Sequence, residues 1–108
     1  MTNKRKIQIL KKVIQKFEKL IPKLERDERA IHNTHNHLLC TTIHYELFTK
    51  PEQQLWDDGK EDLTSFIKRE FKIRMPKNKG KSAKWDITPD GYQARINACK
   101  KAIERLSK

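Results

Sequence analysis

Several kinds of residue are scarce in this chain, and each scarcity excludes a class of protein. Among 108 residues there are three glycines and two cysteines, and only 35% of the residues are hydrophobic. No run of about 18 apolar residues exists, so the sequence predicts no membrane-spanning helix. The glycines (Gly59, Gly80 and Gly91) lie far apart, which excludes a glycine-rich phosphate-binding loop. Two cysteines are too few for a disulfide-rich secreted scaffold.

The beginning of the chain carries no sign of secretion. Its first residues are basic, but no apolar block with a small-residue cleavage site follows them. We therefore expect a cytoplasmic protein in which Cys40 and Cys99 are reduced thiols of the core. A chain of this length is sufficient for one core, and we expect a single helical domain spanning residues 1–108.

What the chain has in excess is positive charge, and this charge is concentrated at both ends. Its 25 Lys and Arg outnumber its 14 Asp and Glu, giving a net charge of +11. The net charge is +6 over residues 1–30, −3 over residues 31–71 and +8 over residues 72–108. Such an uneven distribution predicts attraction to a polyanion, either nucleic acid or the acidic surface of another protein.

The spacing of apolar residues predicts an all-α fold, a compact bundle of about four to five helices. Apolar positions recur in steps of three and four, as on one face of an α-helix, and no useful stretch alternates with period two. Pro22 interrupts the first of these patterns, so we expect that helix to kink or restart near Leu20. We expect helices over about residues 4–24, 39–48, 51–56 and 89–108, and a helix from residue 63 to 71 with Ile73 or Met75 beyond. A further helical stretch follows the first helix to about residue 31.

The two terminal helices resemble each other in sequence. Residues 5–14 and 94–103 share an Ile, a Lys-Lys pair and a final Ile at matching positions. Both helices are basic and amphipathic, and both need the same core, so we expect them to pack side by side. Their lysine faces would then combine into one basic surface.

A cluster of histidines around a cysteine raises the question of a metal site. The four histidines of the chain lie within residues 32–44, together with Cys40. On a helix, His37, Cys40 and His44 project to similar sides, and a four-residue separation is used by zinc ligands. A closed zinc site needs four ligands, however, and Cys40 falls on an apolar stripe. We interpret Cys40 as a core residue and expect no cofactor, with a zinc-binding helper protein as an alternative.

No arrangement of residues typical of an enzyme is present. Pairs of acids occur at Asp57-Asp58 and Glu61-Asp62, where they are typical of a helix end and of the first turn of the next helix. No nucleophile, base and orienting group are brought together by a recognisable motif. We therefore expect a binding protein without enzymatic activity.

The strongest functional signal is a basic cluster over residues 72–84, most of which falls in a loop (76–84) that we expect to be flexible. Such a loop can follow a phosphate backbone and displace its counterions. Basic rows on the terminal helices are expected to add to this contact, because helix faces that merely meet solvent usually mix both signs of charge. The predicted polyanion-binding residues are Lys72, Arg74, Lys77, Lys79, Lys81 and Lys84 in the cluster, Lys12, Lys16, Lys19 and Lys23 in the first helix, and Lys101 and Arg105 in the last.

The segment from Trp85 to Ile103 resembles the ending of a group of small bacteriophage proteins. It contains a Trp, a short apolar stretch, Thr88-Pro89-Asp90-Gly91, and then an Arg-Ile pair within a basic amphipathic helix. Leu38-Leu39-Cys40 is similar to a central motif of the same group. The resemblance covers about half of the chain. It implies an early, non-virion phage protein acting inside a bacterial host cell, and it carries over no binding residues.

This resemblance keeps a second class of function open. Many small phage proteins bind and disable a host or defence factor, so the alternative to nucleic-acid binding is an inhibitor or adaptor. Such a protein would dock on a host protein and cover its nucleic-acid site. The expected surface for it is the His32–His37 region or the acidic turn at Asp57-Asp58. Docking of this kind predicts tolerance of salt and an aromatic hot spot.

Overall fold

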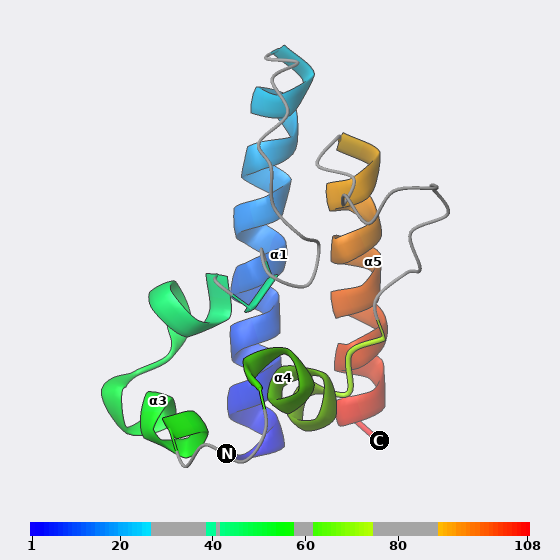
Figure 1. Cartoon of the computed structure of the whole chain (residues 1–108). Helices are drawn as coiled ribbons and strands as arrows, with labels where there is room; N and C mark the ends of the chain where they lie inside the picture. The colour runs from blue at the N-terminus through cyan, green and yellow to red at the C-terminus, as the bar shows by residue number, and fades with distance from the viewer. Residues whose placement is uncertain (27–38, 41, 58–61, 75–88) are drawn as a thin grey trace.

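The fold is described by a computed structural model covering residues 1–26, 39–40, 42–57, 62–74 and 89–108 (Figure 1). Over these ranges the chain forms α1 (Asn3–Arg26), η1 (Thr42–Leu47), α3 (Lys50–Asp57), α4 (Leu63–Phe71) and α5 (Pro89–Leu106). Of these, η1 is a short π-helix and the others are α-helices. The described residues contain no strand, and the predicted all-α bundle is confirmed. None of the described helices combines the length and the hydrophobicity needed to span a bilayer.

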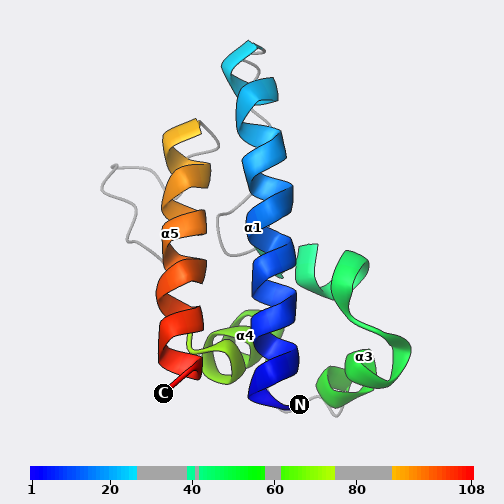
Figure 2. The ribbon, with the colours of Figure 1, turned by 180° about the vertical axis from the view of Figure 1, so that it is seen from behind.

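The two terminal helices form the frame of the bundle. α1 and α5 lie side by side and antiparallel, so that both chain ends meet at one end of the molecule (Figures 1 and 2). There the side-chain amide of Asn3 donates a hydrogen bond of 3.3 Å to the carbonyl of Leu106. Further along, the rings of Phe17 and Tyr92 meet edge to face with their centroids 5.1 Å apart. The predicted packing of the terminal helices is therefore confirmed.

The first helix runs through its proline. α1 continues without interruption from Asn3 to Arg26 with Pro22 inside it, so the predicted restart near Leu20 is wrong. Pro22 removes the backbone donor that would bond the carbonyl of Glu18. Both residues lie on the exposed side of the helix, where water can satisfy that carbonyl. The loss of this one bond near the end of a 24-residue helix does not break it.

The core is built from the apolar faces of α1, α4 and α5 together with Leu39, Cys40, Ile43 and Phe48. The predicted stripes on α1, α4 and α5 are its main components, and both thiols lie within it as free cysteines. Burial raises the pKa of the Cys99 thiol to about 12, and it also raises the pKa of Cys40. The buried core residues are Ile9, Leu10, Val13, Ile14, Phe17, Leu39, Cys40, Ile43, Phe48, Phe66, Ile67, Phe71, Ile73, Tyr92, Ile96, Cys99, Ala102 and Leu106.

The segment before α3 differs from the expected α-helix. Leu39 and Cys40 are helical, but Thr42–Leu47 forms a π-helix. Its wide turn is closed by a 2.8 Å hydrogen bond from the Phe48 amide to the Ile43 carbonyl, five residues back. With this geometry Ile43 and Phe48 both enter the core. The helical period of the sequence predicted the burial but not the wider turn.

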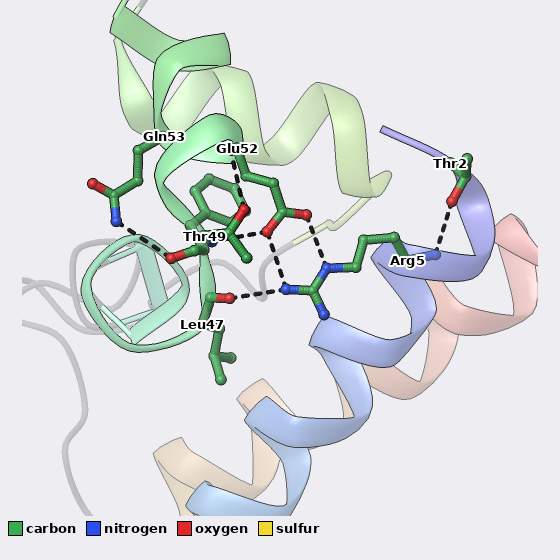
Figure 3. Close-up of polar contacts among 7 residues, drawn as sticks. Thr2, Arg5, Leu47, Thr49, Glu52 and Gln53 are labelled. Atoms are coloured by element: carbon green, nitrogen blue, oxygen red, sulfur yellow. Dashed lines mark hydrogen bonds and ion pairs between the residues drawn. The ribbon is translucent and has the colours of Figure 1, made fainter.

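One arginine of α1 holds η1 and α3 against the frame (Figure 3). The guanidinium of Arg5 donates to both carboxylate oxygens of Glu52, at 2.8 and 3.0 Å, and to the carbonyl of Leu47 at 3.0 Å. Glu52 also accepts from the backbone amide of Thr49, and the Thr49 hydroxyl accepts from the amide of Glu52. This reciprocal pair is a capping box, so the same carboxylate starts α3 and anchors it to α1.

Candidate anion-binding site

A pocket lined almost entirely by cations lies where the end of α4 approaches α5. The pocket is open to solvent and has a volume of about 320 Å³. Five of its six lining residues are basic, and no acidic residue of the described chain lines it. The lining residues are Lys68, Arg69, Lys72, Ile73, Arg74 and Arg105.

The sequence of α4 explains how its two cations reach this pocket. Phe66, Ile67 and Phe71 are buried, which leaves Lys68 and Arg69 on the outward side of the last turns. The helix starts at a defined residue because Oδ1 of Asp62 accepts from the Ser65 amide at 2.8 Å, as an N-cap. This bond and the nearby Ser65 hydroxyl lower the pKa of Asp62, which holds the cap ionised. Asp62 thus caps α4 instead of lying in its first turn, where the sequence predicted it, and Glu61 lies outside the described residues.

The backbone turns sharply at Lys72. This residue ends α4 in the left-handed conformation, with φ of 53° and ψ of 34°. Because a side chain crowds the backbone there, the conformation costs about 1 kcal/mol in a residue other than glycine. The turn sends Ile73 back into the core, where 4% of its surface is exposed, and leaves Lys72 and Arg74 on the outside. Alternating burial therefore places two cations around one apolar residue.

The cation from α5 is fixed by a bond to this same turn. Nη1 of Arg105 donates to the carbonyl oxygen of Lys72 at 2.8 Å. On α5, Ala102 and Leu106 are buried in the core, and this packing fixes the position of Arg105 beside the end of α4. The bond satisfies one of the carbonyl groups that a helix end leaves without a partner.

Within the described part of the chain, the charge of the pocket is only partly neutralised. Glu70 pairs with Lys6 at 3.0 Å and with Arg69 at 2.6 Å, and these contacts, led by Lys6, lower its pKa. Lys68, Lys72 and Arg74 form no ion pair with the described residues. Cations in the last turn also favour a helix end electrostatically, which gives Lys68, Arg69 and Arg105 a structural role. Lys72 and Arg74 lie beyond the helix and gain less from that effect.

Three of the predicted binding residues lie in this pocket, namely Lys72, Arg74 and Arg105. Lys101 is exposed on α5, one turn before Arg105, and does not line the pocket. Lys68 and Arg69 line it but were not predicted. Their signal was present in the sequence, because they lie three and four residues before Lys72, but they fell within the segment whose total charge is negative.

The basic row of α1 lies in a different place. Lys12, Lys16 and Lys19 are exposed, and Lys16 pairs with Glu46 of η1. In both overall views, η1 and α3 lie on the side of α1 away from α5 (Figures 1 and 2). Lys16 therefore faces η1, whereas Arg105 faces the end of α4. The expected union of the two lysine rows into one basic surface stays a prediction.

Several predicted residues fall outside the described residues. These are Lys77, Lys79, Lys81 and Lys84, together with the side chain of Lys23. The same holds for the expected loop at 76–84.

One cation of the net charge is unavailable to a ligand. Arg95 is fully buried, with its guanidinium 4.1 Å from the centre of the Tyr92 ring. It is part of the core rather than of the basic surface.

The metal candidates are not brought together as a site in the described chain. Cys40 is buried, and its thiol hydrogen-bonds the Thr64 hydroxyl with Sγ and Oγ1 3.6 Å apart. His44 is half-buried and meets Tyr45 edge to face at 4.5 Å. His37 lies outside the described residues. Among the described residues no group of three or more His, Cys, Asp or Glu is placed to hold a metal ion.

Comparisons with protein-family models, with curated proteins and with solved structures found no match to this chain. The function is therefore argued from the residues of the pocket and from the charge of the molecule.

Proposed function

We propose that this protein is a non-enzymatic binding module that contacts the phosphate backbone of a nucleic acid through the cationic pocket and the basic residues near it. The observation that carries the proposal is the convergence of five cations on one open pocket that no acidic residue of the described chain lines. The net charge of +11 adds attraction at longer range. Lys77 and the three lysines after it follow Arg74 closely in the sequence, and we assign them to the same contact.

Contact with the backbone rather than with the bases fits the residues that line the pocket. Lys and Arg neutralise phosphates without reading sequence. None of the lining residues is aromatic, so the pocket itself offers no platform for base stacking. Asp62 caps the start of α4, and its carboxylate would be repelled by phosphates if that end entered a groove. We therefore expect binding that is independent of nucleotide sequence.

The test is the salt dependence of binding to short labelled DNA and RNA, measured by fluorescence anisotropy. About five phosphate contacts predict a loss of affinity of roughly a few hundredfold between 50 and 200 mM salt. Arg74→Glu should weaken binding and flatten this dependence, because it reverses a charge in the pocket. Lys50→Glu is the matched control, since Lys50 is exposed on α3 and does not line the pocket. Absence of salt-dependent binding to either nucleic acid would contradict the proposal.

A protein partner is the second candidate, and one observation favours it. Tyr45 of η1 is 74% exposed, and tyrosine is a frequent hot-spot residue of protein interfaces. The resemblance to small phage proteins makes a bacterial host or defence protein the expected partner. Affinity purification from a bacterial lysate treated with nuclease tests this candidate. A host protein retained at moderate salt and lost with Tyr45→Ala would support it, and a lysate in which nuclease removes every partner would contradict it.

A further inference from the structure

The backbone at the mouth of the pocket is strained at one residue. Helices most often place glycine where a left-handed conformation ends them, but this chain has Lys72 there. Among the described residues other than glycine, it is the only one with a positive φ. Conformations of this kind are concentrated at binding sites, where the surrounding structure holds them in place.

We infer that the pocket is a preformed phosphate-binding site in which Lys72 and Arg105 together hold one phosphate group of the bound chain. This inference rests on the proposed function and adds to it the place of tightest contact and the two residues responsible. Phosphate is the favoured ligand because its oxygens accept from several donors at once, and the pocket combines ammonium and guanidinium donors with no competing carboxylate in its described lining.

Arg105 is suited to this role because its position is set before any ligand arrives. Its guanidinium carries five N–H donors in a rigid plane, and the Nη1 bond to the Lys72 carbonyl holds that plane. The remaining donors of the same plane can then meet phosphate oxygens in pairs. A guanidinium held in this way loses less conformational freedom on binding than a lysine on a free side chain.

The left-handed turn places both cations at once. Lys72 supplies an ammonium group from its side chain and, through its carbonyl, the anchor for Arg105. Ile73 follows directly and is buried, so the turn is tied to the core and cannot drift. Glycine would fill this left-handed position without strain and would satisfy the packing equally well. The chain has a lysine there instead, which adds a positive charge to the pocket.

Three variants test the inference, and binding is measured by anisotropy with a short labelled oligonucleotide at 50 mM salt. Arg105→Gln removes one positive charge from the pocket, and Lys50→Gln removes one from the exposed surface of α3, outside the pocket. Lys72→Gly removes the ammonium while relieving the backbone, so unfolding cannot explain its effect. The oligonucleotide is used with and without a 5′-terminal phosphate, which distinguishes a strand end from an internal phosphate as the bound group.

We expect Arg105→Gln and Lys72→Gly each to weaken binding by roughly five- to tenfold, and Lys50→Gln by less than about twofold. If the wild type prefers the 5′-phosphorylated oligonucleotide and the pocket variants do not, the bound group is the phosphate at the strand end. If the pocket variants lose the same affinity for both oligonucleotides, the bound group is an internal phosphate. Equal weakening by all three variants would overturn the inference while leaving the proposed function standing, because the charge would then act as a diffuse field.

A second readout covers the case in which no oligonucleotide binds. Inorganic phosphate is titrated into ¹⁵N-labelled protein, and the Lys72 amide and the Arg105 Nε signals are followed by NMR. Shifts confined to the pocket would keep the phosphate site and reject only the nucleic-acid proposal. Shifts spread evenly over the lysine-bearing helices, or none at all, would reject the site.

Discussion

At the scale of single residues, folding and the proposed binding make opposite demands on Lys72. Its left-handed conformation disfavours every side chain with a Cβ, whereas the proposed phosphate contact needs its charge in the pocket. We predict that Lys72→Gly raises the free energy of unfolding by about 0.5 to 1 kcal/mol, because glycine reaches this conformation without crowding. Urea denaturation followed by circular dichroism measures the change.

Lys72→Ala is the control for this prediction. It removes the same charge but keeps a Cβ in the left-handed turn, so the strain stays and stability should change by less than about 0.5 kcal/mol. If alanine stabilises the protein as much as glycine does, then relief of charge repulsion explains the gain. The backbone strain would in that case not be significant.

The residues of α4 show what the sequence can predict and where it stops. Leu63, Phe66, Ile67 and Phe71 predicted the helix and its buried face, because their spacing follows the α-helical period. The end of the helix was not marked, since neither glycine nor proline stands at position 72. The pocket depends on that turn and on its contact with α5, so only part of its lining was predicted.

At the scale of elements, one ion pair ties α3 to α1. Glu52 is bonded by Arg5 and by Thr49, and these contacts, led by Arg5, lower its pKa to about 2 (Figure 3). A carboxylate whose pKa falls on folding stabilises the protein above its unfolded value of 4.5 and loses that effect as the pH falls toward 2. The pair should therefore contribute fully at neutral pH.

We predict that Glu52→Gln lowers the free energy of unfolding by about 2 kcal/mol at pH 7, after allowance for partial solvent screening. The difference from the wild type should shrink between about pH 4.5 and pH 2, because the wild-type carboxylate is protonated over that range. Denaturation curves across this range test both statements. Glu18→Gln, on the exposed face of α1, should leave stability nearly unchanged at every pH. A constant difference down to pH 2 would contradict the assignment.

One part of the Glu52 contact could be predicted from the sequence, and the other part could not. The Thr49…Glu52 spacing is that of a capping box and can be recognised without a structure. Its partner Arg5 lies 47 residues earlier, and no local pattern connects the two. The π-helix of η1 has the same origin, because its turn places Ile43 and Phe48 in a core shared with other helices. Helix existence followed from periodicity, whereas these attachments follow from packing.

At the scale of the whole molecule, charge is separated more finely than the three segments of the sequence suggest. The terminal helices are neighbours (Figure 1), yet Lys16 of α1 pairs with Glu46 of η1, whereas Arg105 of α5 bonds the backbone at the end of α4. Arg95 contributes to the net charge but lies in the core. A count along the chain therefore predicts an attraction to polyanions, and the fold decides which of the cations lie together.

The excess of charge predicts how the free protein responds to ions. The chain has 25 Lys and Arg against 14 Asp and Glu, and its excess positive charges repel one another. Sodium chloride screens this repulsion, so raising its concentration from about 10 to about 200 mM should raise the melting temperature. Sodium sulfate at equal ionic strength should raise it further, because an oxyanion that binds the folded pocket stabilises the protein by mass action, by about 1.4 kcal/mol at tenfold excess over the dissociation constant. Sulfate also stabilises proteins in general by exclusion from their surface. The variant carrying both Lys72→Gly and Arg105→Gln separates these effects, since exclusion acts on it equally. If sulfate exceeds chloride by the same margin in the variant and in the wild type, the pocket does not bind oxyanions.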